Sequence, residues 1–165
     1  MPKNVEIERK FLVTSDSYKQ QSVAHHEICQ GYLCVEPGKT IRVRIADDRA
    51  YLTIKSGARK GGLARFEWER EIDSEDAKEL MALCMEKRIL KTRWIVPAEA
   101  VTGDGLPVTG KPLKWEVDEF HGHKEGLVVA EIELEDEAQT FLKPDFIGRE
   151  VTGDHRYSNA YMITE

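Results

Sequence analysis

Cysteine, long apolar runs and secretion signals are scarce or missing from this 165-residue sequence. Its three cysteines form no CxxC pair and have no histidine at zinc-ligand spacing, which argues against a disulfide framework or a structural zinc site. No hydrophobic stretch reaches the length of a transmembrane helix, and the N-terminal residues are too polar for a secretion signal. A Walker A loop, internal repeats and low-complexity segments are also missing. We therefore expect a soluble, cytoplasmic protein.

The balance of charge narrows the choice of partners. The sequence has 30 acidic and 24 basic residues, a net charge of −6. A general nucleic-acid-binding protein needs a basic field, so we expect no nucleic-acid partner and no membrane partner. Hydrophobic residues make up 41% of the chain, which is enough for one domain with a core. We predict a single domain over residues 1–165.

Charged residues are abundant, and many of them alternate with apolar residues over short segments. The first such segment is Glu6–Phe11. Residues two apart share a face of a β-strand, so each segment predicts a strand with one charged and one apolar face. The predicted strands are Val5–Val13, Ile28–Val35, Thr40–Ala46, Tyr51–Ser56, Ala64–Ile72, Ile89–Val96, Leu113–Phe120 and Leu127–Leu134.

Helices are few in this sequence. One is predicted from Ser74, as its cap, to Lys87–Arg88 at its C-terminal end. A second is predicted over Asp136–Phe141, and a short third one near Tyr157. The fold class is therefore α+β, in which eight mainly antiparallel strands close as a barrel or form two packed sheets.

The charged faces are sorted by sign. Arg42-x-Arg44 and Lys91-x-Arg93 are basic rows, whereas Glu67-x-Glu69 and Glu131-x-Glu133 are acidic rows. Charged strand faces usually lie in water, so an ordinary sandwich remains one interpretation. Like charges that face each other across strands cost up to about 1 kcal/mol, and solubility alone does not require such separation. The separation of acidic from basic rows is explained if the acidic rows bind metal cations and the basic rows bind a polyanion at one shared site.

The motifs resemble those of the CYTH superfamily, the triphosphate tunnel metalloenzymes. The N-terminal Glu6-x-Glu8-x-Lys10 is similar to the ExExK signature of that family. The further matching motifs are Gln30–Leu33, Arg42-x-Arg44, Lys55, Arg65-x-Glu67-x-Glu69, Lys91-x-Arg93, Asp118-x-Phe120, Glu131-x-Glu133, Glu150–Thr152 and Arg156–Asn159. The resemblance spans nearly the whole chain. It implies an eight-stranded antiparallel barrel with a charged tunnel that binds triphosphates with Mg²⁺ or Mn²⁺.

The resemblance also implies roles for individual residues. The candidate metal ligands are Glu6, Glu8, Glu67, Glu69, Asp118, Glu131 and Glu133. Glu6 and Glu8 would share a first metal with Glu131 or Glu133, while Glu67, Glu69 and Asp118 would hold a second metal or position the attacking water. The candidate phosphate ligands are Arg42, Arg44, Lys55, Arg65, Lys91, Arg93 and Arg156. Lys10, Tyr32 and Glu69 are the candidate catalytic residues.

The small bacterial inorganic triphosphatases are the members that this chain resembles most. We therefore expect metal-dependent hydrolysis of inorganic triphosphate, with a small-molecule substrate and a monomer or homodimer. Class IV adenylate cyclase, thiamine or nucleoside triphosphatase, and a sensor that binds polyphosphate without turnover remain alternatives. A cyclase needs base and ribose contacts that the sequence does not identify, and a sensor would not need so many carboxylates.

Overall fold

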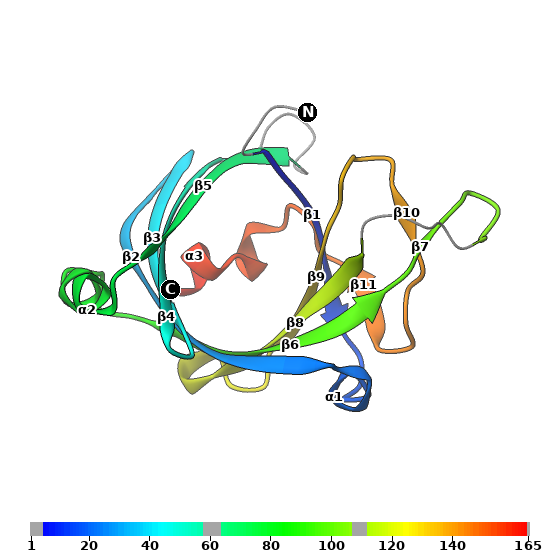
Figure 1. Ribbon diagram of the computed structural model, residues 1–165, viewed down its shortest axis with the longest axis horizontal. Helices are drawn as coiled ribbons and strands as arrows, with labels where there is room; N and C mark the ends of the chain where they lie inside the picture. Colours follow the sequence, from blue (N-terminus) through cyan, green and yellow to red (C-terminus); the bar gives the residue numbers. More distant parts are fainter. Residues whose placement is uncertain (1–4, 58–63, 107–111, 165) are drawn as a thin grey trace.

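A closed antiparallel barrel dominates the computed structural model, which describes residues 5–57, 64–106 and 112–164 (Figure 1). The barrel strands are β1 (Val5–Val13), β2 (Ala24–Glu36), β3 (Lys39–Ala46), β4 (Arg49–Ser56), β5 (Ala64–Ile72), β6 (Ile89–Ala98), β8 (Leu113–His121) and β9 (Val128–Glu133). The remaining elements are α1 (Tyr18–Gln21), α2 (Ser74–Ala82), β7 (Ala100–Val101), η1 (Gly122–Lys124), β10 (Thr140–Phe141), β11 (Ile147–Glu150), η2 (His155–Tyr157) and α3 (Asn159–Met162). The predicted eight-stranded barrel is confirmed.

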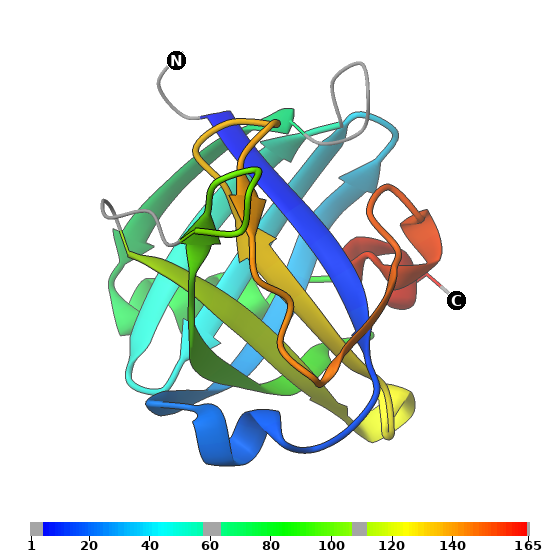
Figure 2. The ribbon, with the colours of Figure 1, turned by 90° about the vertical axis from the view of Figure 1, so that its right-hand side faces the viewer.

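Strand β1 closes the barrel because it pairs on both sides. The strand order is β1-β5-β4-β3-β2-β6-β8-β9, and β9 returns to β1. Val5–Ile7 pair with β5, whereas Glu8–Leu12 pair with β9, and β11 adds to the end of β1. Figure 2 shows β1 crossing the wall obliquely. Every charged row therefore faces one enclosed space.

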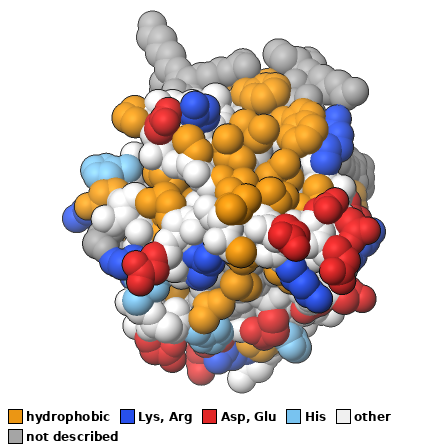
Figure 3. All heavy atoms as spheres, turned by 90° about the vertical axis from the view of Figure 1, so that its left-hand side faces the viewer, with side chains coloured by type: hydrophobic (Ala, Val, Ile, Leu, Met, Phe, Trp, Pro, Cys, Tyr) orange, Lys and Arg blue, Asp and Glu red, His pale blue; other side chains and the backbone are white. Residues whose placement is uncertain are grey.

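The apolar parity of the strands faces outward, where the hydrophobic core lies. Trp115 of β8 is fully buried and makes edge contacts with Phe11 of β1 and Phe141 of β10. Trp94 of β6 packs against Tyr18 of α1 in the same way. Figure 3 shows apolar side chains gathered on the outer face of the β2–β5 side. Apolar side chains therefore cover much of the outer face of the barrel, and charged side chains line its lumen.

Two helix predictions need correction. The structure has no helix over Asp136–Phe141; Thr140 and Phe141 instead form β10, which pairs with β7, because Phe141 packs against Phe11 and Trp115. Helix α2 is capped by Asp73 rather than by Ser74, since the Asp73 side chain accepts a hydrogen bond from the Glu75 amide. This helix also ends at Ala82, before the predicted basic end.

The predicted short helix near the C-terminus is present as η2 and α3, and α3 lies over the opening at one end of the barrel (Figures 1 and 2). Met162 and the following Ile163 pack against an apolar collar at one end of the lumen. The collar consists of Leu12, Tyr32, Ile89, Phe120 and Val129. Segment η2–α3 therefore covers that end of the barrel.

The longest helix in the described chain is α2, with nine residues. No described helix has the length and apolar character needed to cross a membrane.

Gly31 of β2 is required for the approach of α2 to the barrel. A Cβ atom at this position would lie 2.7 Å from Met81 Sδ and 2.9 Å from Cys84 Sγ.

We expect Gly31→Ala to lower the free energy of unfolding by about 1–3 kcal/mol, measured by urea denaturation, because overpacking displaces α2. Gly103→Ala is the matched control, since a Cβ there would meet no atom within 4 Å. Equal stability of the two variants would contradict this account.

Candidate active site

The inward-facing side chains line a cavity of about 820 Å³ inside the barrel. Its charged lining includes Glu6, Glu8, Lys10, Arg42, Arg44, Lys55, Arg65, Glu67, Glu69, Lys91, Arg93, Lys114, Glu116, Glu131 and Glu133. The structure therefore brings together most of the site residues predicted from the sequence. Within this lining, β3, β4 and β6 contribute only cations and β9 only carboxylates, whereas β1, β5 and β8 contribute both.

An acidic wall is formed by β1, β8 and β9. It consists of Glu6, Glu8, Glu116, Glu131 and Glu133. Glu8 lies opposite Glu133, and Glu116 lies opposite Glu131, so like charges face each other across strands. Burial, together with Glu6, Glu116 and Glu8, raises the pKa of the Glu133 carboxyl. The wall thus holds more negative charge than its neighbours compensate.

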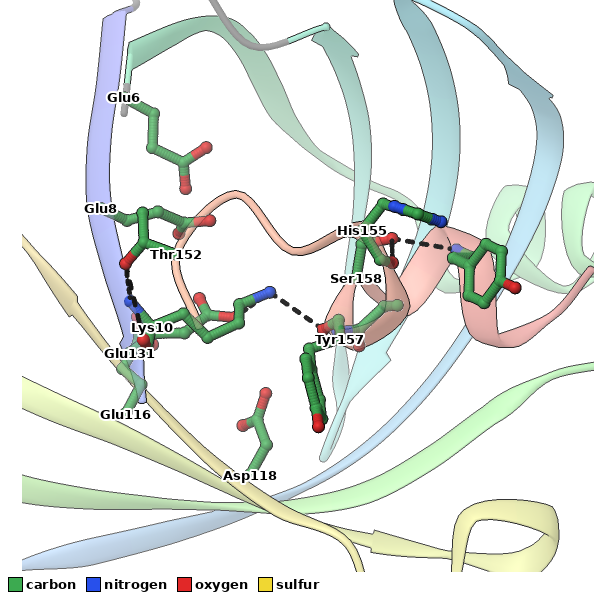
Figure 4. A network of polar contacts seen from close by, with 12 residues as sticks. Glu6, Glu8, Lys10, Glu116, Asp118, Glu131, Thr152, His155, Tyr157 and Ser158 are labelled. Atoms are coloured by element: carbon green, nitrogen blue, oxygen red, sulfur yellow. Dashed lines mark hydrogen bonds and ion pairs between the residues drawn. The ribbon is translucent and has the colours of Figure 1, made fainter. Parts of the chain in front are cut away.

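Basic side chains reach across to these carboxylates. Lys55 Nζ lies 3.0 Å from Glu6 Oε2, and Arg65 Nη2 lies 3.2 Å from Glu8 Oε1. Lys10 Nζ lies 3.3 Å from Glu131 Oε1, and Figure 4 shows Lys10, Glu6 and Glu8 extending from β1 into the lumen. With these pairs formed, no three His, Cys, Asp or Glu side chains of residues 5–57, 64–106 and 112–164 are arranged to hold a metal ion.

The acidic wall nevertheless fits a hard divalent cation. All of its donors are carboxylate oxygens, which Mg²⁺ and Mn²⁺ prefer. Burial is the largest cause of the raised pKa of Glu133, and the nearby carboxylates Glu6, Glu116 and Glu8, which a cation would offset, raise it further. Because Arg65 and Lys55 already pair with Glu6 and Glu8, a bound cation would have to replace them as partners.

A basic wall, which consists of Arg42 and Arg44 from β3 and Lys91 and Arg93 from β6, also lines the cavity. Arg93 and Lys91 both contact Asp118. Arg93 Nε lies 2.7 Å from Asp118 Oδ1, and Lys91 Nζ lies 2.8 Å from Asp118 Oδ2. Burial alone would raise the pKa of Asp118, but the two cations lower it to about 2. Both oxygens of Asp118 therefore pair with protein cations. This pairing differs from the prediction that Asp118 shares a site with Glu67 and Glu69, which lie on β5.

Cations of the basic wall are crowded and deeply buried. Burial, together with Arg42 and Arg93, lowers the pKa of Arg44 to about 9. Burial, Arg93 and Arg44 lower the pKa of Lys91 to about 7, against the opposing effect of Asp118. Arg42 Nε is buried without a hydrogen-bond partner in the described part of the chain. Arg44 is therefore short of negative charge and Arg42 Nε of a hydrogen-bond acceptor, both of which a polyanion supplies.

Glu69 and Tyr32 lie on the same side of the lumen. Thr53 Oγ1 donates a hydrogen bond of 2.6 Å to Glu69 Oε1, and Arg42 Nη2 lies 3.6 Å from the same oxygen. Tyr32 is buried in the collar, and its hydroxyl accepts a hydrogen bond of 3.3 Å from Gln30. The catalytic roles of these residues stay predictions.

Arg156, a predicted phosphate ligand, lies elsewhere. Its side chain is 61% exposed and pairs with Asp154 at 2.6 Å. The cause is local: Asp154 caps η2 and its carboxylate holds the nearby guanidinium. The structure therefore does not place Arg156 at the site.

The model of the CYTH domain family matches residues 4–161 of the chain. The chain belongs to the CYTH domain family. It is 43% identical to an inorganic triphosphatase of Acetivibrio thermocellus over 161 residues, which covers 96% of this CYTH domain chain and 92% of the relative. An inorganic triphosphatase of Nitrosomonas europaea is 35% identical over 158 residues, covering 93% of each chain. A crystal structure of an inorganic triphosphatase is 30% identical, with a TM-score of 0.62 and coverage of 97% of this chain and 95% of that one.

The sequence analysis assigned no role to four residues of this CYTH domain site, namely Gln30, Lys114, Glu116 and Asn159. Glu116 lies two positions before Asp118 and could have been found from that spacing, since both share a strand face. Gln30 and Asn159 lie in motifs that match the family, but they are neutral and carry no charge pattern that would assign them a role. Their positions depend on the return of the C-terminal segment into the barrel, which local spacing does not reveal.

Removing the Asp118 carboxylate should strongly destabilise the CYTH domain. Asp118→Asn leaves Lys91 and Arg93 buried without their shared counter-ion, which we expect to cost about 3–5 kcal/mol at pH 7 by urea unfolding. Because the folded pKa of about 2 lies below the ordinary value, the ionised carboxyl stabilises the fold above about pH 4. That contribution is lost as the pH falls toward 2, so the difference between wild type and variant should narrow over this interval.

Asp48→Asn provides the control, because Asp48 is exposed in the β3–β4 connection. It should change the free energy of unfolding by less than about 0.5 kcal/mol. A difference for Asp118→Asn that stays constant with pH would refute the role of its ionised form.

Proposed function

We propose that this CYTH protein hydrolyses inorganic triphosphate to pyrophosphate and phosphate with the help of Mg²⁺ or Mn²⁺. The observation that carries the proposal is the pairing, across a cavity of about 820 Å³, of an under-compensated basic wall with an under-compensated acidic wall. A polyanion satisfies the first wall and a divalent cation the second. The relatives named inorganic triphosphatase support the same reaction.

The basic wall would bind the phosphate oxygens. Arg42 and Arg44 present guanidinium groups from β3, and the unpartnered Arg42 Nε is a donor without an acceptor. A guanidinium matches phosphate through paired N–H donors, while lysine provides a compact charge. Lys91 and Arg93 face the same cavity from β6, so four cations would surround a bound triphosphate. Their charge would also stabilise the leaving pyrophosphate.

The acidic wall would hold the metal ion, with Glu6, Glu8, Glu131 and Glu133 as ligands. When bound, the ion supplies neutralisation of the phosphate charge and orientation of the oligophosphate. Glu67 and Glu69 remain the candidates for a second metal or for the attacking water, with Glu69 held by Thr53.

Hydrolysis forms a bond from water oxygen to the terminal phosphorus and breaks the bridging P–O bond, and the water proton must be accepted. Positioning and electrostatic stabilisation account for most of such a reaction. Lys10 extends into the lumen between the acidic wall and η2, which suits it for positioning phosphate or water with Tyr32. Glu69 is the candidate group to accept this proton, because it would position the attacking water.

A protein of this kind would act in the cytoplasm on a small molecule. Cys29, Cys34 and Cys84 are all unpaired, which suits a reducing compartment. The net charge of −6 disfavours nucleic acid as a partner. A monomer and a homodimer both remain compatible with a site whose described residues come from one chain.

Product analysis tests the reaction against its alternatives. The purified protein is incubated with Mg²⁺ or Mn²⁺ and with tripolyphosphate, ATP or thiamine triphosphate, and phosphate and cyclic AMP are measured. We expect phosphate release to be fastest with tripolyphosphate. Cyclic AMP from ATP would identify a cyclase instead, and binding without any product would identify a sensor.

Glu8→Gln should lower the turnover of tripolyphosphate by about 10²–10³-fold, which is typical of the loss of one charge-stabilising group. Glu71→Gln is the matched control, because Glu71 continues the row of Glu67 and Glu69 but is half exposed and pairs with Arg49. The control should retain wild-type rates. Full activity of Glu8→Gln would remove the acidic wall from the mechanism.

Metal binding can be tested without turnover through Arg65. Arg65→Gln removes the cation that pairs with Glu6 and Glu8, so Mn²⁺ alone should bind more tightly, by about tenfold, or ~1.4 kcal/mol. Titration calorimetry with Mn²⁺ and no phosphate gives the affinity. Arg49→Gln loses the same charge at an exposed pair with Glu71 and should leave the affinity unchanged. Weaker Mn²⁺ binding by Arg65→Gln would place the metal elsewhere.

A further inference from the structure

Two amide side chains, Gln30 and Asn159, connect the basic wall to the C-terminal segment. Gln30 of β2 is fully buried, and its Oε1 accepts a hydrogen bond of 3.0 Å from Arg44 Nε. Its Nε2 donates a hydrogen bond of 2.9 Å to Asn159 Oδ1 in α3. The same Asn159 oxygen accepts a hydrogen bond of 2.8 Å from Lys91 Nζ. A continuous chain of hydrogen bonds therefore runs from Arg44 through Gln30 and Asn159 to Lys91.

The uncharged nature of both acceptors has a physical consequence. An amide oxygen fixes the direction of a cationic donor but leaves its full positive charge available to another anion. A carboxylate at either position would neutralise that charge and would compete with any bound anion for the same N–H groups. Asp118 already fills that role for Arg93 and Lys91 from the opposite side.

We propose that Gln30 and Asn159 are positioning residues that hold Arg44 and Lys91 in place for the triphosphate without adding negative charge beside them. The inference rests on the proposed function, because it takes triphosphate as the anion that these cations bind. Neither residue needs to touch the substrate. Each acts through the cation that it orients.

The position of Asn159 links this arrangement to the C-terminal segment. Asn159 begins α3, whose Met162 packs into the apolar collar, so docking of the helix and placement of Lys91 occur together. Lys10 makes a parallel connection, because its Nζ donates to the Tyr157 carbonyl oxygen at 3.1 Å (Figure 4). The segment η2–α3 thus orients two lysines of the cavity as well as covering one end of it.

Gln30→Glu and Gln30→Met separate charge from alignment. Both are close in size to glutamine; glutamate accepts from Arg44 but carries a negative charge, whereas methionine is uncharged and a much poorer acceptor. We expect the affinity for tripolyphosphate, measured by calorimetry in EDTA without metal, to fall in the order wild type, Gln30→Met, Gln30→Glu. The loss for Gln30→Glu should be at least about tenfold and should appear in KM more than in kcat.

Asn159→Asp repeats the test at the other end of the chain, next to Lys91, and should weaken binding in the same way. It also keeps the proposal testable if Gln30→Glu does not fold. Gln20→Glu is the matched control, because it makes the same change on the exposed surface of α1 and should bind as wild type does. Thermal melting of each variant separates lost alignment from lost stability.

Binding by Gln30→Glu and Asn159→Asp within twofold of wild type would overturn the proposal. Affinity losses that follow the melting temperatures, with Gln30→Met as weak as Gln30→Glu, would also overturn it by showing a purely structural role. Wild-type protein that binds tripolyphosphate but does not hydrolyse it would refute the proposed function alone, since the order of affinities would still decide the inference. No binding by wild type in EDTA would refute the inference, while the product analysis with Mg²⁺ or Mn²⁺ decides the proposed function separately.

Discussion

Enclosing opposed rows of charge inside a closed barrel is the constraint on which this structure depends. A buried charge is costly unless it has partners, so each inward row must meet the opposite sign across the lumen or on the next strand. Asp118 between Arg93 and Lys91, and Glu6 beside Lys55, satisfy that requirement. The apolar side chains must then be covered from outside, which is why α1, α2 and the β7–β10 pair lie against the outer wall.

The ion pairs of the lumen also explain how a stable fold can be a binding site. If every charge in the lumen were fully paired, no charge would be available to bind a ligand. Here some charged side chains are less well paired than others. Burial and like charge lower the pKa of Arg44 and raise that of Glu133, so the two walls retain unmatched charge of opposite sign. A triphosphate with a divalent cation is electrostatically complementary to such a pocket. The amides Gln30 and Asn159 maintain this imbalance because they align cations without neutralising them.

Much of the fold followed from the sequence because strand faces are a local property. The bounds predicted for Val5–Val13 and Ala64–Ile72 are those of β1 and β5, since alternation and flanking residues are visible within each segment. The helix predicted over Asp136–Phe141 was wrong because the aromatic contacts of Phe141 with distant strands override the local preference of a short segment. Arg156 kept its local partner Asp154 and therefore stays outside the cavity.

By itself the sequence determined which residues share a strand face and which faces carry each sign, because the two-residue period of a strand is independent of its neighbours. The family resemblance followed from the same motifs. The strand pattern alone left open which face is the inner one, and the resemblance implied that it is the charged face. Only the tertiary structure decided that Glu8 lies opposite Glu133 and that Asn159 returns to meet Lys91. These contacts depend on closure through β1 and on the docking of α3, which join segments far apart in the chain and leave no trace in local spacing.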